Sequence, residues 1–100
     1  MADHRPVIVI AALEQEAHAL VGRMPRSQSI GPRLSIWEGN GLVVMVAGIG
    51  KVAAAMAAQY ACDVFKPRCV IAIGLAGGVE DGARPGQVLV ATGAVQHDID

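Results

Sequence analysis

Three short apolar runs, each followed at once by a helical or glycine-rich stretch, constrain this fold most. They occupy residues 7–12 (VIVIAA), 42–47 (LVVMVA) and 69–73 (CVIAI). In the first two runs, the uninterrupted β-branched and small side chains are typical of strands that are buried on both faces of a sheet. Because helical patterns separate these runs, the sequence predicts an α/β fold in which helices flank a mixed or mainly parallel central sheet.

Two segments between the apolar runs have the spacing of helices. Residues 13–24 end before Pro25, and residues 51–65 end before Lys66-Pro67. The second segment is rich in alanine and apolar almost all round, which predicts a buried or tightly packed helix. In the first segment, apolar residues at helical spacing form one stripe: Leu13, Ala17, Leu20, Val21 and Met24.

Further strands are predicted from weaker signals. Residues 28–38 contain Gly31-Pro32 and then alternate apolar and polar side chains, which indicates a hairpin-like strand. The sequence Gly39-Asn40-Gly41 is a turn signal. Near the end, residues 87–91 follow a turn and are predicted to form one more strand.

The composition is unusually apolar for a chain of this size. Apolar residues make up 53% of the 100 residues and charged residues 17%, with a net charge of -1. This balance excludes a disordered chain, and it provides no excess of positive charge that would bind nucleic acid. No uncharged apolar run reaches the roughly 18 residues of a membrane span. The apolar excess, and a last predicted strand without a covering helix, lead us to expect that residues 1–100 are the N-terminal part of one larger domain.

The cysteines and the C-terminal acidic residues give no cofactor site of their own. Cys62 and Cys69 stand in apolar surroundings without a metal-binding spacing, so we expect buried thiols in a reducing cytoplasm. His97, Asp98 and Asp100 could ligate a metal, but three such residues without a fourth more often form a hydrogen-bond network. We therefore predict no metal. Trp37 is expected in the core or an interface.

Two glycine-rich loops follow neighbouring predicted strands. Residues 48–53 (GIGKVA) match a dinucleotide-binding fingerprint on paper, but no acidic side chain stands about twenty positions on, near Leu75. A plain tight turn and a loop that shapes another ligand's pocket remain open. Residues 74–78 (GLAGG) have the same character. Together the loops predict a pocket at the carboxyl ends of the strands.

Two carboxylates follow the first predicted strand. Glu14 and Glu16 fall in the first turn of a helix, where acidic side chains offset the helix dipole. Either could instead face a cleft and act as a general base on water, and helical spacing does not choose between them.

These segments together resemble one family. VIVIAALEQEAHAL, AGIGKVAAAMAA, VIAIGLAGGVEDGARPGQVLVA and QHDID, in this order, are similar to the N-terminal half of the 5′-methylthioadenosine/S-adenosylhomocysteine nucleosidases. Those enzymes belong to the purine nucleoside phosphorylase superfamily. The resemblance covers essentially residues 7–100.

The resemblance implies hydrolysis of an N-glycosidic bond with release of adenine, without a metal or organic cofactor. It implies a cytoplasmic homodimer whose partner is a small nucleoside, not a nucleic acid or a membrane. Glu16 matches the family's water-activating acid, and Leu75 stands where the family commonly has serine. Further positions implied to line the nucleoside pocket are Ala12, Leu13, Ile49, Ala76 and Gly77.

The same resemblance limits what this chain can do alone. The family's acid that protonates adenine and its ribose-binding glutamate lie in the C-terminal half, so the 100 residues are predicted to be inactive by themselves. Two alternatives remain. One is a phosphorylase of the same superfamily, including the hopanoid-associated type, which would need an anion site; Arg84 is the arginine near the glycine loops, and we expect it in a turn. The other is a non-catalytic nucleotide-binding module.

Overall fold

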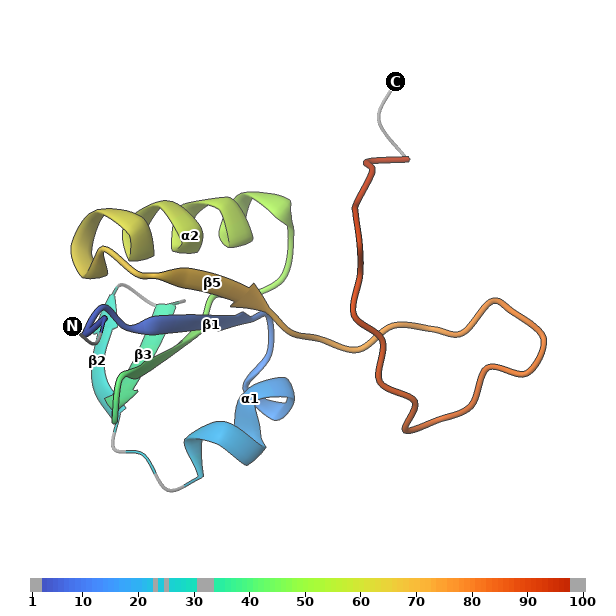
Figure 1. Cartoon of the computed structure of the whole chain (residues 1–100), viewed down its shortest axis with the longest axis horizontal. Coiled ribbons are helices and arrows are strands. Elements are labelled where there is room, and N and C mark those ends of the chain that lie inside the picture. Colours follow the sequence, from blue (N-terminus) through green and yellow to red (C-terminus); the bar gives the residue numbers. More distant parts are fainter. Residues whose placement is uncertain (1–2, 23, 25, 31–33, 98–100) are drawn as a thin grey trace.

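The computed structural model describes residues 3–22, 24, 26–30 and 34–97. These residues form a five-stranded sheet with a helix on each face (Figure 1). The elements in chain order are β1 (Val7–Ala11), α1 (Glu14–Val21), β2 (Arg26–Ile30), β3 (Leu34–Gly39), β4 (Leu42–Val46), α2 (Lys51–Phe65) and β5 (Cys69–Ala72).

The sheet is mixed, as the sequence predicts. Its strand order is β2-β3-β4-β1-β5, and β1 pairs in parallel with both β4 and β5. β3 is antiparallel to β2 and β4. The two glycine-rich loops follow β4 and β5, which are predicted to be neighbours but are not, because β1 lies between them. The three parallel strands still end at the same edge of the sheet, so the loops that follow them start there.

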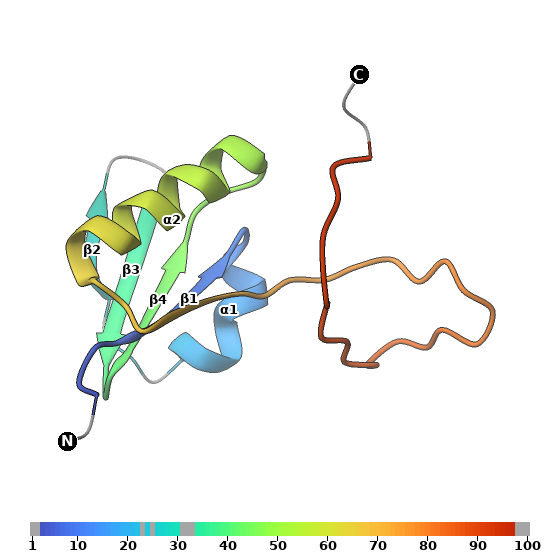
Figure 2. The ribbon, with the colours of Figure 1, turned by 45° about the horizontal axis from the view of Figure 1, so that its top comes forward.

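The alternation of side chains along β1 divides the core into two layers. Ile8 and Ile10 lie in the cluster that contains Ala57 and Ala61 of α2. Val9 and Ala11 lie in the other cluster, with Ala17 and Val21 of α1. Figure 2 shows α1 and α2 on opposite faces. Trp37 is buried in the α1 layer, which confirms its predicted place in the core.

The predicted element boundaries are largely confirmed. The helix predicted at 51–65 is α2, and the helix predicted at 13–24 is the shorter α1. Residues 28–38 contribute to two strands, β2 and β3, and Gly31-Pro32 lies outside the described residues. The predicted turn forms with Asn40 at φ 53° and Gly41 at φ 77°. Both central residues of this tight hairpin thus have positive φ, as a type I′ turn requires.

The strand predicted at residues 87–91 is not formed. Residues 74–97, here called the C-terminal segment, run away from the sheet (Figures 1 and 2). Val88, Leu89 and Val90 are 82–89% exposed. A β-type sequence forms a strand only when a neighbour supplies hydrogen bonds and packing, and no strand of the described chain pairs with this stretch.

Two predictions of burial are also wrong. Cys62 and Cys69 are exposed, because Cys62 lies on the outer side of α2 and Cys69 on the edge strand β5. On α2 only Ala57 and Ala61 are buried, whereas Val52 and Met56 are 74% and 68% exposed. The chain covers only one side of this helix. That the apolar excess belongs to a larger domain stays a prediction.

Within the part of the chain that the structure describes, no helix is long and apolar enough to cross a bilayer.

Candidate functional site

Glu16 joins the end of β1 to the start of α1. Leu13 is the N-cap of α1 and has no side-chain oxygen to receive the first helical N–H groups. Instead Glu16, at the third helical position, reaches back, and its Oε1 accepts hydrogen bonds from the backbone N–H of Leu13 (3.0 Å) and of Ala12 (3.2 Å). This is the carboxylate half of a capping box. Glu16 therefore has a clear structural role at the helix N-terminus.

The other oxygen of Glu16 contacts a distant part of the chain. Oε2 accepts a hydrogen bond of 3.0 Å from the backbone N–H of Leu75, 59 residues away in sequence. Pairing of β5 with β1 brings these segments together and extends past the strand, because the N–H of Ile73 donates to the carbonyl of Ile10 at 3.0 Å. One carboxylate thus bridges the loops that follow β1 and β5.

The N–H donors also stabilise the charged form of this carboxylate. The backbone N–H of Leu13, and then that of Leu75, lower the pKa of Glu16 more than its partial burial raises it, and the N–H of Ala12 adds to the lowering. Glu16 is therefore ionised at neutral pH. A carboxylate offers about four acceptor positions. Two donors occupy Oε1 and one occupies Oε2, so Oε2 retains an acceptor position for a further donor such as water.

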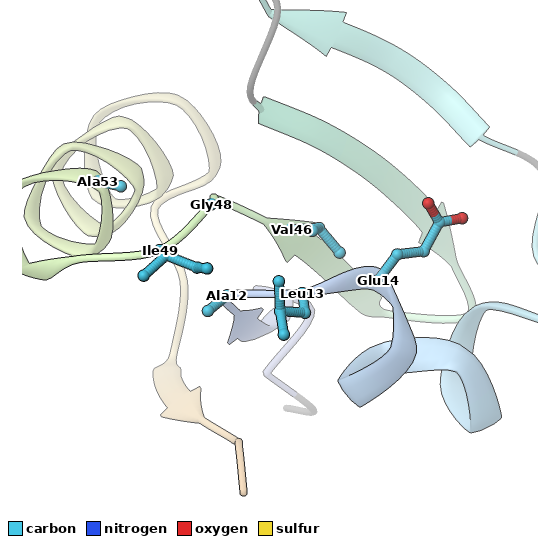
Figure 3. A pocket seen from close by; sticks show the side chains of 7 residues that line it. All are labelled: Ala12, Leu13, Glu14, Val46, Gly48, Ile49 and Ala53. Carbon is cyan, nitrogen blue, oxygen red and sulfur yellow. The ribbon is translucent and has the colours of Figure 1, made fainter.

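A groove lies at the carboxyl ends of β1 and β4. Glu16 is not among its lining residues, but Ala12 and Leu13, whose backbone N–H groups bind the Glu16 carboxylate, are. Its volume is about 440 Å³. Figure 3 shows Ile49 on the loop before α2, Ala53 in the first turn of that helix and Leu13 near the start of α1. The Glu14 carboxylate points away from Ile49. The groove is lined by Ala12, Leu13, Glu14, Val46, Gly48, Ile49 and Ala53. Its position agrees with the usual place for ligands in α/β sheets.

The structure separates the predicted site residues into two groups. Ala12, Leu13 and Ile49 line the groove. Leu75, Ala76 and Gly77 are exposed in the C-terminal segment, and of these Leu75 reaches Glu16 through its backbone while its side chain is 88% exposed. Val46 was not singled out from the sequence, and Ala53 only as the last residue of the GIGKVA stretch. Their signal is positional, since Val46 ends β4 and Ala53 lies in the first turn of α2.

That loop is held in a conformation that favours glycine. Gly48 has φ 93°, and its N–H donates to the carbonyl of Ala12 at 3.1 Å. Gly50, the N-cap of α2, has φ 111° and ψ 162°, a region that is essentially restricted to glycine. The loop therefore turns from β4 into α2 through two glycines, and Ile49 between them lines the groove.

We expect Gly50→Ala to destabilise the fold by about 1–3 kcal/mol, because alanine would be held in a strained backbone region. Equilibrium denaturation would measure the change in the free energy of unfolding. Gly93→Ala is the matched control, since Gly93 has no positive φ and an added Cβ there meets no atom within 4 Å. If the two variants had the same free energy of unfolding, that result would contradict backbone strain at position 50.

The remaining predicted residues are placed as follows. Arg84 begins a turn in the C-terminal segment, where the N–H of Gln87 donates to its carbonyl. Asp98 and Asp100 lie outside the described residues, and His97 is exposed. No group of three or more histidine, cysteine or acidic residues in the described ranges is arranged to hold a metal ion.

Comparison with known proteins identifies the family. Residues 6–100 match the profile of the Phosphorylase superfamily. A 5′-methylthioadenosine/S-adenosylhomocysteine nucleosidase from Actinobacillus succinogenes is 38% identical over 98 residues, covering 92% of this chain and 42% of that protein. A nucleosidase of the same name from Listeria monocytogenes is 34% identical over 97 residues, with the same coverage of 92% and 42%.

A solved structure gives the same result. It is the crystal structure of a 5′-methylthioadenosine/S-adenosylhomocysteine nucleosidase from Neisseria meningitidis in complex with methylthio-immucillin-A. This structure matches the chain with a TM-score of 0.69 and 36% identity. The match covers 80% of this chain and 37% of that protein. The chain spans about two-fifths of the length of the curated relatives, at 42%. The resemblance seen in the sequence is thus confirmed, and the chain belongs to the phosphorylase superfamily.

Proposed function

We propose that this chain is the N-terminal part of an enzyme that hydrolyses the N-glycosidic bond of 5′-methylthioadenosine or S-adenosylhomocysteine and releases adenine. The names of the similar relatives support this substrate class. The observation that carries the proposal is the position of Glu16, an ionised carboxylate that is bound by the backbone of the groove residues Ala12 and Leu13 and has one acceptor position left on Oε2.

In this proposal Glu16 acts as the general base. Oε2 accepts a hydrogen bond from a water molecule and takes its proton as the water oxygen bonds to the anomeric carbon of the ribose. The bond between that carbon and the adenine nitrogen breaks, and its electron pair leaves with adenine, which a separate acid protonates. A base on one face of the sugar and an acid on the leaving group follow the logic of inverting glycosidases.

The surrounding residues would bind the nucleoside. Ala12, Leu13 and Ile49 offer apolar surface in the groove. We assign Leu75, Ala76 and Gly77 to the same pocket, with Gly77 contacting the ligand through its backbone. The leaving-group acid and the ribose-binding glutamate are assigned to the remaining length that the relatives have. No cofactor takes part.

We further propose that the protein works as a cytoplasmic homodimer. The exposed apolar side chains on α2 support a partner surface there. Neither nucleic acid nor a membrane is proposed as a partner.

Phosphate dependence tests the proposed reaction. The full-length protein that carries this chain is expected to release adenine from both nucleosides at the same rate with and without phosphate, with free sugar as the product. Chromatography of the products measures both. A requirement for phosphate and a sugar phosphate product would instead establish a phosphorylase. The 100-residue chain alone is expected to release no adenine, because general acid catalysis typically contributes about 10²–10⁴-fold.

A further inference from the structure

Gly74 lies directly against the Glu16 carboxylate. A Cβ added at Gly74 would stand 3.1 Å from Glu16 Oε2 and 3.8 Å from its Cδ. The first distance is tighter than nine in ten of the contacts that Cβ atoms make in proteins, so the carboxylate would have to move by a few tenths of an ångström. Gly74 is not among the glycines with positive φ, which include Gly48 and Gly50. Its backbone conformation is therefore open to other residues, and the close approach of the carboxylate distinguishes this position.

The carboxylate cannot move away from such a Cβ without loss. A glutamate tip in solvent would rotate aside at little cost. Here Oε2 is held by the N–H of Leu75, and Oε1 by those of Ala12 and Leu13, at 3.0–3.2 Å. A shift of Oε2 away from residue 74 would lengthen at least one of these bonds. The donor most affected is Leu75, because it is the next residue in the chain.

We propose that Gly74 is a positioning residue whose missing side chain fixes the place of Glu16 Oε2 and keeps its remaining acceptor position open to water. The proposal deepens the proposed function and rests on it for the catalytic consequence. Its structural part, the dependence of Glu16 on Gly74, stands on the contacts above. Larger side chains at residue 74 should have graded effects, because they displace Oε2 further and also cover it.

Kinetics of the full-length protein give the first test. Gly74→Ala is expected to lower kcat for adenine release by about tenfold or more with little change in KM, since small misplacements of a catalytic group are costly. Gly74→Val should lower kcat further. The acidic limb of the kcat–pH profile should move to higher pH in Gly74→Ala, because a weakened Leu75 N–H bond raises the pKa of Glu16. Gly93→Ala is the control and should keep the parent profile.

A second readout does not depend on activity. In carboxyl-¹³C-labelled protein, NMR titration should show a higher pKa for Glu16 in Gly74→Ala than in the parent. A double-mutant cycle in thermal denaturation should show that Gly74→Ala lowers Tm when Glu16 is present and has little effect in a Glu16→Ala background. If Gly74→Ala does not fold, the double variant decides: folding restored by Glu16→Ala supports the proposal, and continued failure overturns it.

The outcomes separate this inference from the proposed function. An unchanged Glu16 pKa and unchanged kcat in Gly74→Ala would overturn the positioning role. A Glu16→Gln protein that still hydrolyses its substrate, together with a raised Glu16 pKa in Gly74→Ala, would overturn the proposed function and leave the positioning of Glu16 by Gly74 in place.

Discussion

Glu16→Gln in the full-length protein is expected to lower kcat for adenine release by about 10²–10⁴-fold, the range that general base catalysis typically contributes. An amide cannot take a proton from water at neutral pH. Binding of a non-hydrolysable nucleoside analogue should persist, because the groove residues Ala12, Leu13 and Ile49 are unchanged. Steady-state kinetics and calorimetry with the analogue measure the two effects.

Glu38→Gln is the matched control for that variant. Glu38 pairs with Val43 close to the hairpin turn, and the adjoining Leu42 pairs with Val7 at the start of β1. Glu38→Gln therefore makes the same chemical change, but at the end of the sheet opposite Glu16. We expect its kcat to equal that of the parent protein. Near-parental turnover in Glu16→Gln would remove Glu16 as the base.

Glu16→Gln also has a predictable effect on the structure. Glutamine has one acceptor oxygen, so an amide that serves the N–H groups of Ala12 and Leu13 turns its NH₂ toward the N–H of Leu75. In the parent, the lowered folded-state pKa of Glu16 contributes stability above the pKa of an unfolded glutamate. This contribution is lost as the pH falls through the folded-state pKa, and Glu16→Gln should lack that component in denaturation curves measured against pH.

Ile8→Ala is expected to destabilise the chain by about 2–5 kcal/mol, the range for deleting a large side chain from a packed core. Ile8 is fully buried on the interior strand β1, on the face that α2 covers. Urea denaturation followed by circular dichroism would measure the loss. Val88→Ala is the control because Val88 is 87% exposed, and its effect should stay within about 0.5 kcal/mol. A similar loss in both variants would contradict the division into core and C-terminal segment.

The elements that could be predicted from the sequence are those that short-range patterns specify. The β1 run, with Ile8 and Ile10 alternating against Val9, can bury both faces only between two helical layers. The alanine-rich spacing of α2 and the Asn40-Gly41 turn are equally local. Burial on α2 was mispredicted because an apolar side chain is buried only where another element covers it. Residues 87–91 do not form the predicted strand for a related reason, because a strand needs a neighbouring strand to pair with its backbone.

The candidate site divides along the same line. The sequence by itself determined that Glu16 lies in the first turn of a helix after a buried strand and that glycine loops follow the strands, since these depend on neighbours within a few residues. Helical spacing left Glu14 and Glu16 equivalent, and the family resemblance alone favoured Glu16. Only the tertiary structure decided that the Leu75 N–H reaches Glu16 and that Gly74 touches the carboxylate, because parallel pairing of β1 with β5 joins segments that no local pattern relates.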